Sequence, residues 1–331
     1  MIASKLATRP HDNEPSHLKS YNQEAMEFHM GLEDYRPQRL EQILEQATRT
    51  YAAHPLLTTA LPNGMSTTLS FTEVEAASAG LAHYFRDVLK LETGDVVAIQ
   101  SPNCISYIIA LLGILRAGLI LSNVNPLYTE HETRHQLRDS GAKVLIGSTV
   151  FADTVEKAVE GTDVEHVMAV SLTDFFPPLK RAGVDFLLNR VKHVARPLGV
   201  PHVRLEQAIK QGSVCTAEIS DYTRALDPAR DTIYQYSGGT TGASKGVRLT
   251  EAGLVTNIDQ FIALAPSLLE MESETMVLAL PVYHVFGLLA SVMSIRHGVH
   301  IVLIPSPRPL SNLKAAFAKF QPKLFPGVNT L

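Results

Sequence analysis

A short segment at residues 234–250, YQYSGGTTGASKGVRLT, carries groups that could hold a chain of phosphates. Its glycines allow backbone N–H groups to approach an anion closely, its hydroxyls can donate to phosphate oxygens, and Lys245 adds positive charge. The segment differs from a Walker A loop, because Ser244 precedes the lysine and Gly246 follows it. No hydroxyl therefore occupies the position of the Mg²⁺ ligand. We predict a polyphosphate-binding loop of another kind.

The position of this loop argues against a flexible surface linker, which is the alternative that its composition allows. Tyr236 ends a predicted apolar strand, and the glycine-rich residues after it lead towards a predicted helix at 251–265. A linker seldom connects two such elements. A loop that binds phosphate is therefore the favoured interpretation.

A second pattern, HETRH at residues 131–135, matches H-E-x-x-H, in which two histidines on one helical face bind zinc beside a glutamate base. Zinc helices of this kind are normally buried among apolar neighbours, whereas the surrounding sequence TEHETRHQLRDSG is almost wholly polar. No further ligand motif follows it in the sequence. We interpret these residues as a surface helix and predict no metal site.

Strands and helices alternate along the chain and must position these residues. Predicted strands lie at 96–100, 119–124, 143–148, 165–170, 231–237, 275–281 and 300–305. Predicted helices lie at 39–54, 69–89, 105–116, 129–140, 151–160, 251–265, 285–295 and 311–320. Capping boxes mark two of the helix starts, one formed by Thr72 with Glu75 and one by Thr129 with Glu132. The alternation predicts an α/β fold of successive subdomains, with mainly parallel sheets that helices cover on both faces.

The pattern also suggests how the chain is divided. Residues 1–35 are polar and aperiodic, which predicts a mobile arm. Residues 36–225 form a first predicted α/β subdomain, and residues 226–331 form a second one that carries the phosphate loop. The alternation stops at Leu331 without a helix end or a polar tail, so we expect the second subdomain to be truncated.

Composition limits the classes of protein that these elements can form. The 331 residues are 45% apolar and 19% charged, which suits a large core and excludes a disordered chain. The net charge of −4 gives no sign of nucleic-acid binding. Cys104 and Cys215 lie far apart without a partner motif, as expected in a reducing cytoplasm. The most apolar stretch, 107–121, is too short to span a membrane, and it predicts a buried helix followed by a buried strand.

Several stretches resemble the adenylate-forming superfamily, which is also called acyl-activating or AMP-binding. SGGTTGASKGV resembles its phosphate-binding signature, and LPVYHVFGLL at 280–289 resembles its next motif, which carries a histidine at the position of His284. Residues 91–146 resemble its N-terminal core. NVNPLYT at 123–129 and the terminal PGVNTL are similar to bacterial long-chain fatty acid–CoA ligases in particular. The resemblance covers about residues 35–331.

This resemblance implies an enzyme with two half-reactions. A fatty acid carboxylate attacks the α-phosphate of ATP to give acyl-AMP and pyrophosphate, and the thiol of coenzyme A then displaces AMP. ATP, Mg²⁺ and coenzyme A are the small molecules that it implies. His284 is the implied catalytic residue beside the carboxylate, although without the motif we would favour a histidine satisfied in the core, and Tyr283 and Phe286 are implied wall residues. The implied nucleotide-binding residues are Tyr236, Ser237, Gly238, Gly239, Thr240, Thr241, Gly242, Lys245 and Gly246.

Other motifs of the superfamily have no counterpart in these residues. They are the Tyr-Gly-x-Thr-Glu segment that contacts adenine and Mg²⁺, the aspartate that binds the ribose, and the C-terminal cap domain with its lysine. We therefore expect the 331-residue chain alone to have little or no ligase activity. Two alternatives remain. One is a non-catalytic remnant or split subunit that binds nucleotide or acyl chain and needs a complementing polypeptide, and the other is a ligase for another carboxylic acid.

A locally basic, amphipathic stretch at 175–203 suggests a further contact. The apolar side chains that could share one face are Phe186, Leu187, Val191 and Val194, and the basic ones are Lys180, Arg181, Arg190, Lys192 and Arg196. One hypothesis is peripheral contact with the inner face of an anionic membrane, from which a cytoplasmic enzyme collects fatty acid. A surface helix that packs on the sheet is the favoured alternative.

Overall fold

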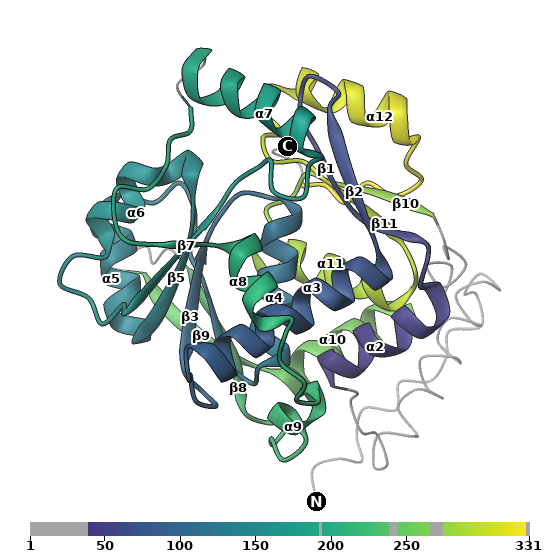
Figure 1. Ribbon diagram of the computed structural model, residues 1–331. Coiled ribbons are helices and arrows are strands. Elements are labelled where there is room, and N and C mark those ends of the chain that lie inside the picture. Colours follow the sequence, from purple (N-terminus) through teal and green to yellow (C-terminus); the bar gives the residue numbers. More distant parts are fainter. Residues whose placement is uncertain (1–38, 192–193, 238–243, 265–273, 329–331) are drawn as a thin grey trace, which may run out of the picture.

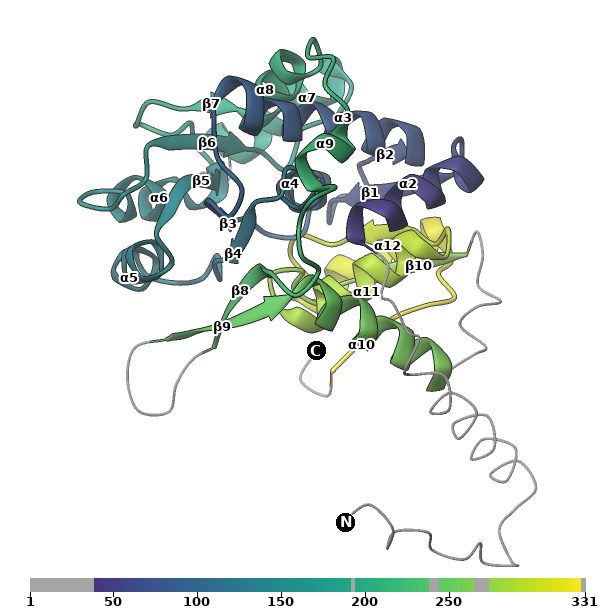
Figure 2. The ribbon, with the colours of Figure 1, turned by 90° about the horizontal axis from the view of Figure 1, so that it is seen from below.

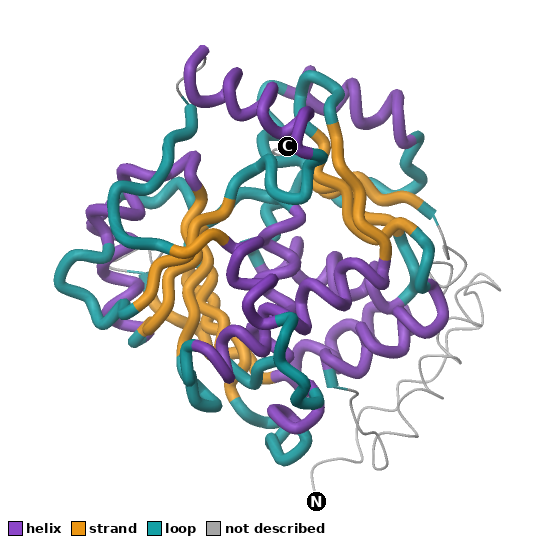
Figure 3. Tube along the Cα trace, in the orientation of Figure 1, coloured by secondary structure: helices purple, strands orange, loops and turns teal. Residues whose placement is uncertain are grey.

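Two mainly parallel β-sheets form the frame of the protein, with helices between and around them (Figure 1). This computed structural model describes residues 39–191, 194–237, 244–264 and 274–328, so the predicted arm at 1–35 lies outside the described residues. Figure 3 shows the two sheets on opposite sides of a central group of helices. The predicted α/β fold with mainly parallel, helix-covered sheets is confirmed.

The larger sheet has seven strands in the order β7-β6-β5-β3-β4-β8-β9. Neighbouring strands in it are parallel except β8 and β9, which form an antiparallel hairpin. Its central strands are buried along most of their length, as expected where helices cover both faces of a parallel sheet. The strands are β3 (Val96–Gln100), β4 (Ile120–Asn123), β5 (Ala142–Ser148), β6 (His166–Val170), β7 (Val203–Arg204), β8 (Asp231–Ser237) and β9 (Lys245–Thr250).

The smaller sheet joins segments from the two ends of the described chain, in the order β10-β11-β1-β2. Strand β1 pairs in parallel with β11, so that Thr58 lies beside Val302. The strands are β1 (Pro55–Ala60), β2 (Ser66–Ser70), β10 (Thr275–Leu278) and β11 (His300–Leu303). The two sheets are therefore not separated at residue 225, where the sequence predicted a domain boundary, because strands pair where they bury apolar surface rather than in chain order. The division into domains itself stays a prediction.

Helix α4 (Ile105–Arg116) lies between the two sheets (Figure 2), and all of its side chains are buried. It is followed by the buried strand β4, which confirms the predicted helix and strand at 107–121. Helix α3 (Phe71–His83) packs against both α4 and α8 (Leu205–Gly212) on the inner side of the larger sheet. No helix within the described parts of the chain is long and apolar enough to cross a membrane.

The remaining helices lie on the outer face of the larger sheet, at the ends of the sheets or, as for α11 (Val285–Arg296), in the core between them. Helices α5 (Glu130–Ser140) and α6 (Ala152–Ala158) cover the outer face of the larger sheet (Figure 1). The others are α2 (Leu40–Tyr51), α7 (Pro178–Phe186), α9 (Ile219–Thr223), α10 (Glu251–Leu264), α11 (Val285–Arg296) and α12 (Lys314–Phe320). Thus the described part of the region 171–225, where the predicted alternation was interrupted, contains three short α-helices, a π-helical turn at Leu187–Val191 and a two-residue strand.

The start of α3 differs from its prediction. Ser70, not Thr72, is the N-cap residue, because its backbone is extended and its hydroxyl oxygen accepts from the Glu73 N–H at 3.3 Å. The Glu73 carboxylate in turn accepts from the Ser70 N–H at 2.7 Å, which completes the capping box. Thr72 lies inside the first turn, and Glu75 forms an ion pair with Arg116 of α4 at 2.5 Å. The predicted box was therefore two residues too late, since both pairs fit the same sequence pattern.

Candidate functional site

The predicted phosphate loop connects the two strands of the β8–β9 hairpin. Ser237 ends β8 and lies opposite Lys245, the first residue of β9, so both are at the open end of the hairpin. The chain therefore passes through a strand before it reaches α10, whereas the sequence predicted that the loop leads towards a helix. That strand was missed because β9 is exposed along most of its length and has little apolar signal. The predicted residues Gly238, Gly239, Thr240, Thr241 and Gly242 lie outside the described residues.

Tyr236 packs within this hairpin and connects it to α5. Its ring is buried, and its hydroxyl donates to Asp139 Oδ2 of α5 at 2.6 Å. A Cβ atom on Gly246 would lie 2.9 Å from Cζ of the Tyr236 ring, so only glycine fits across the hairpin from it. Burial, together with the hydrogen bond to the Asp139 carboxylate, raises the pKa of Tyr236 and keeps the hydroxyl protonated. These contacts assign Tyr236 and Gly246 to the packing of the hairpin; their predicted contact with nucleotide stays a prediction.

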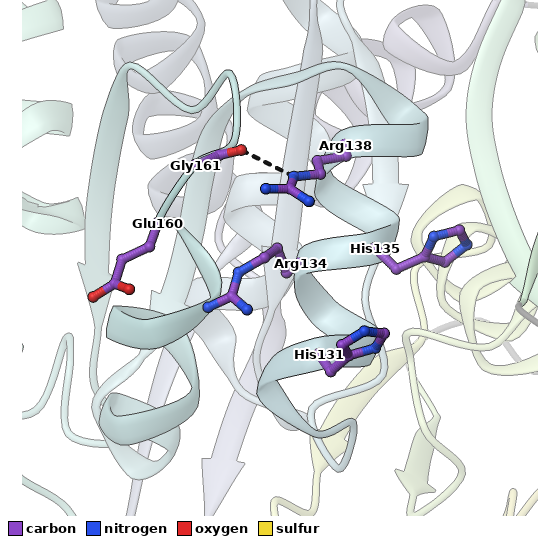
Figure 4. A pocket seen from close by; sticks show the side chains of 6 residues that line it. All are labelled: His131, Arg134, His135, Arg138, Glu160 and Gly161. Carbon is purple, nitrogen blue, oxygen red and sulfur yellow. Dashed lines mark hydrogen bonds between the residues drawn. The ribbon is translucent and has the colours of Figure 1, made fainter.

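Helix α5 makes a second contact with the hairpin, through the HETRH segment. His135 Nε2 lies 3.3 Å from the Ser244 carbonyl oxygen, and since a carbonyl can only accept, Nε2 carries the proton. Figure 4 shows His131 and His135 on one side of α5, away from Glu160. Glu132 is engaged in the capping box predicted for this helix, where its carboxylate accepts from the N–H of Thr129 at 2.8 Å. That box is confirmed, and within the described ranges no group of three or more His, Cys, Asp or Glu could hold a metal ion.

An open groove of about 550 Å³ runs along α5 and is lined by His131, Arg134, His135 and Arg138 of that helix, together with Glu160 and Gly161. Arg134 and Arg138 point across it towards the end of α6 (Figure 4). Arg138 Nε donates to the Gly161 carbonyl at 2.9 Å, and Arg134 donates to the Lys157 carbonyl. Cationic groups are favourable beside the free carbonyls at a helix C-terminus. We therefore interpret Arg134 as a cap of α6, and Arg138 as a support of the turn that follows this helix.

His284 lies at the N-cap position of α11, directly after the segment that follows β10. It borders a cavity of about 520 Å³ at the junction of the two sheets, together with Pro102, Asn103, Leu127, Phe151, Tyr283 and Arg308. The His284 and Tyr283 rings are in contact, with centroids 4.6 Å apart. Although His284 as a residue is exposed, the partial burial of its ring lowers its pKa. The ring is therefore neutral at pH 7 and can both accept and donate a hydrogen bond.

Two residues that sequence reasoning missed hold His284 in place. The Asn103 side chain donates to the carbonyls of Leu280 at 2.8 Å and Leu278 at 3.2 Å, and it accepts from the Val282 N–H at 2.9 Å. A Cβ on Gly287 would lie 2.3 Å from the Pro281 carbonyl oxygen, so the turn into α11 requires glycine. Gly287 stands in the histidine motif and could have been recognised there, whereas nothing in the local sequence marks Asn103.

A separate apolar pocket of about 270 Å³ lies between α10, α11 and the C-terminal segment. Its lining includes Ile258, Phe261, Phe286, Ala290, Met293 and Phe325. Phe286 therefore forms a wall of this pocket, and Tyr283 forms a wall of the cavity beside His284. Both were predicted to be wall residues, and the structure places them in two neighbouring cavities that share the start of α11.

Comparison with known proteins agrees with this arrangement. The family described as "AMP-binding enzyme" matches residues 44–331, and the chain belongs to this family. The chain is 37% identical over 299 residues to the long-chain-fatty-acid–CoA ligase of Salmonella typhimurium, covering 89% of this chain and 52% of that protein. It is 33% identical over 248 residues to the ligase of the same name from Bacillus subtilis, covering 73% of this chain and 42% of the relative. The chain thus spans about half the length of the curated relatives it matches.

Solved structures show the same fold. A long-chain-fatty-acid-CoA ligase from Archaeoglobus fulgidus superimposes with a TM-score of 0.70 at 21% identity, covering 88% of this chain and 52% of that one. A benzoate CoA ligase from Burkholderia xenovorans superimposes with a TM-score of 0.69 at 18% identity, covering 89% of this chain and 51% of that one. At these identities the likeness supports the fold alone.

Proposed function

We propose that the protein takes part in the ATP-dependent activation of a long-chain fatty acid to acyl-AMP and then to acyl-CoA. The observation that carries the proposal is the arrangement at the start of α11. His284 borders a cavity with polar groups, and two residues later Phe286 borders an apolar pocket. A fatty acid has the same two parts, a carboxylate and an apolar chain, so the two cavities are suited to its two ends.

The acyl chain is the part that the apolar pocket would hold. Asn257 is the single polar side chain among the described residues that line it, and the other lining residues are aliphatic, aromatic or Met. Each methylene that leaves water for such a site contributes about 0.8 kcal/mol. The curated relatives named above also point to a long-chain acid, and a ligase for another carboxylic acid is the alternative.

The phosphates of ATP would lie at the open end of the β8–β9 hairpin. Lys245 and the Ser237 hydroxyl can neutralise and orient the leaving pyrophosphate, which is the main demand of this type of reaction. Neutral His284 can orient the attacking carboxylate without adding charge that would reduce its nucleophilicity. Mg²⁺ enters as the ion that ATP carries; since no metal-binding cluster was found in the described parts, no protein ligand for it is assigned.

The location and partners follow from the same proposal. Cys104 and Cys215 are both free thiols, as suits a reducing cytoplasm. Because the chain spans about half the length of its relatives, we also propose that the 331 residues alone have little activity and depend on further polypeptide for the rest of the site. A non-catalytic subunit that binds nucleotide or acyl chain is the alternative.

Acid-dependent exchange of pyrophosphate into ATP tests the function, with a panel of long-chain, medium-chain and aryl acids. We expect the 331-residue chain to be nearly inactive and any longer natural form to prefer long-chain acids. In the active form, Lys245→Ala should lower the exchange rate roughly tenfold or more. Lys210→Ala, on the exposed side of α8, is the matched control and should leave the rate unchanged. Absence of acid-dependent exchange in both forms would contradict the proposal.

A further inference from the structure

A single side chain connects the phosphate-loop strand with the residue before His284. Gln235 lies two residues before the end of β8. Its Nε2 donates to the Tyr283 carbonyl at 3.0 Å, and its Oε1 accepts from Asn123 Nδ2 at 3.1 Å. The Gln235 amide therefore links three segments that are far apart in the sequence: the end of β4, the end of β8 and the segment that leads into α11.

The link continues into the core between the sheets. Asn123 Oδ1 accepts from the hydroxyl of Tyr107, a fully buried residue of α4, at 2.5 Å. The Asn123 backbone carbonyl accepts from Gln136 Nε2 of α5 at 2.8 Å, so Asn123 is held from two helices. Burial raises the pKa of Tyr107 far above its usual range, so its hydroxyl always has a proton to donate.

The direction of each hydrogen bond in this chain is fixed. The Tyr283 carbonyl can only accept, so Gln235 must present its NH₂ group to it and its oxygen to Asn123. Asn123 must then present its own NH₂ to Gln235 and its oxygen to the Tyr107 hydroxyl. A carboxylate in place of either amide would set two acceptors against each other. Asn123 and Tyr107 are buried and Gln235 is half-buried, so these directions favour a single geometry of the three side chains.

The link also crosses between the two sheets. Strands β4 and β8 belong to the larger sheet, whereas Tyr283 follows β10 of the smaller one. Asn103 holds the carbonyl of Leu280 and the N–H of Val282, but it does not reach Tyr283. Gln235, in the larger sheet, thus forms a hydrogen bond with the backbone of the residue directly before His284.

We propose that Gln235 is a positioning residue that sets the place of His284 relative to the phosphate-binding end of β8. The role of His284 in this statement rests on the proposed function, whereas the link itself does not. Without the Gln235 amide, the Tyr283 carbonyl and Asn123 Nδ2 lose these hydrogen bonds. Val282 is still held by Asn103 and by the Tyr107 hydroxyl at 3.2 Å, so the expected shift is a local one at Tyr283 and His284. A shift of about 1 Å at a reacting group can lower the rate about 100-fold.

The test compares Gln235→Met, which keeps the volume and removes both hydrogen bonds, with Thr67→Val as the matched control. Thr67 also donates one partly buried hydrogen bond to a backbone carbonyl, that of Phe175 at 2.8 Å, but it lies in β2 at the edge of the smaller sheet. Both variants should lose a similar amount of stability in urea unfolding. A purely structural role for Gln235 predicts that the two variants resemble each other in every other measurement.

The first readout is the NMR titration of the His284 ring in the 331-residue chain, assigned with His284→Asn. Among the described residues around this cavity, Arg308 carries the permanent charge and Tyr283 is the other titratable group. Gln235→Met should raise the pKa of the His284 ring towards the usual value of a histidine, whereas Thr67→Val should leave this pKa unchanged. An unchanged titration in Gln235→Met, or an equal shift in Thr67→Val, would overturn the proposal. If Gln235→Met does not fold, Gln235→Asn, whose shorter amide cannot reach both partners, is titrated instead, with the same expectation.

The second readout is pyrophosphate exchange in whichever form of the chain is active. Gln235→Met should lower kcat about tenfold to 100-fold, with the KM for ATP changed less than about threefold. A change confined to KM would contradict a role through His284. If no form of the chain shows acid-dependent exchange, the proposed function fails, and the titration alone decides whether Gln235 positions His284.

Discussion

At the scale of single residues, most of the site is built from side chains that support others. Tyr236 directly precedes the predicted phosphate-binding residues in the sequence, yet its hydroxyl donates to Asp139 and its ring packs against Gly246. Asn103 and Gln235 likewise use their amides on backbone groups around His284. Residues of this kind keep reactive groups in place, because each rotamer is fixed by packing and hydrogen bonds.

The Tyr236–Asp139 hydrogen bond can be measured directly. We expect Tyr236→Phe and Asp139→Ala each to lower the free energy of unfolding, with a coupling energy of about 1.5 kcal/mol between them, because the bond joins a buried hydroxyl to a carboxylate. Urea denaturation of the two single variants and the double variant gives this coupling. Strictly additive losses would show that the bond does not stabilise the hairpin.

His300 should make stability depend on pH. It is buried in β11, its Nε2 lies 2.7 Å from the Thr58 hydroxyl, and burial lowers its pKa to about 4. The unfolded chain takes up a proton near pH 6.5, which the folded protein does not, so stability is lost as the pH falls below that value. Between pH 7 and pH 5 this group should remove about 2 kcal/mol from the free energy of unfolding.

Denaturation curves at several pH values check this expectation. His300→Gln keeps a hydrogen-bonding side chain but cannot titrate, so its stability should change less between pH 7 and pH 5 than that of the natural chain. Equal pH dependence in both proteins would mean that His300 does not carry the effect.

At the scale of elements, the turn into α11 and the hairpin on α5 determine where the site lies. The hairpin forms hydrogen bonds with His135 and Asp139, which are one helical turn apart on the same face of α5. The turn into α11 is equally constrained, because the chain passes so close to itself that a Cβ atom on Gly287 would lie 2.3 Å from the Pro281 carbonyl oxygen. Such close contacts make these elements sensitive to small changes in size.

Gly287→Ala should therefore lower the free energy of unfolding by about 2–3 kcal/mol, since the new methyl meets backbone that cannot move easily. Gly183→Ala is a suitable control, because Gly183 lies in α7 with nothing within 4 Å of an added Cβ. That control should be neutral or stabilising by up to about 1 kcal/mol, as alanine favours helix. Equal thermal midpoints for the two variants would contradict the steric argument.

Helix α7 has apolar side chains that no sheet covers. Leu179 is 88% exposed and Phe186 63%, and Val191, in the π-helical turn Leu187–Val191 that follows α7, is 58% exposed. These side chains are therefore not packed on the sheet as the favoured alternative expected. Arg181 and Arg196 form ion pairs with Asp174 and Asp153, which reduces the basic charge available to a membrane. Lys192 lies outside the described residues. We propose contact with an anionic membrane surface through these apolar side chains.

Co-sedimentation with anionic vesicles tests this contact. The double variant Phe186→Ser, Val191→Ser should bind roughly tenfold more weakly than the natural chain, because less apolar surface enters the interface. Val214→Ser provides a matched control, since Val214 is 80% exposed but follows α8, away from α7. Vesicle binding that is the same for all three proteins, or absent from all, would remove the membrane proposal.

At the scale of the whole molecule, chain segments from both ends share one sheet. Strands β1 and β2 would form only a hairpin without β10 and β11, and a hairpin alone is marginally stable in water. The helices between the sheets would also lose the smaller sheet as one of the two surfaces against which they pack. The described residues therefore depend on one another across the boundary predicted at 225.

A fragment of residues 39–225 tests this dependence. We expect it to lack a cooperative thermal transition, because it contains β1 and β2 without their partners and β4 without β8. The 331-residue chain should show a cooperative transition in the same circular dichroism experiment. A cooperatively folded fragment would instead support the two subdomains that the sequence predicted.

The sequence by itself determined the elements and the type of chemistry. Alternating apolar runs located the strands of both sheets except β1, β2, β7 and β9, and the capping box at Thr129 was readable because its pattern involves neighbours only. The glycine-rich loop and the histidine motif were readable for the same reason. Each of these signals lies within a few residues of chain, where local backbone preferences and periodicity act.

The tertiary structure decided which elements meet and which side chains hold the site. The pairing of β1 with β11, the contact of Tyr236 with Asp139 and the link through Gln235 join residues separated by about 50 to 240 positions. No periodicity or motif records such distances, because partners are selected by packing and by the need of buried polar groups for hydrogen bonds. The loop after β8 was thus predicted from sequence, whereas its support and its connection to His284 became visible only in the folded chain.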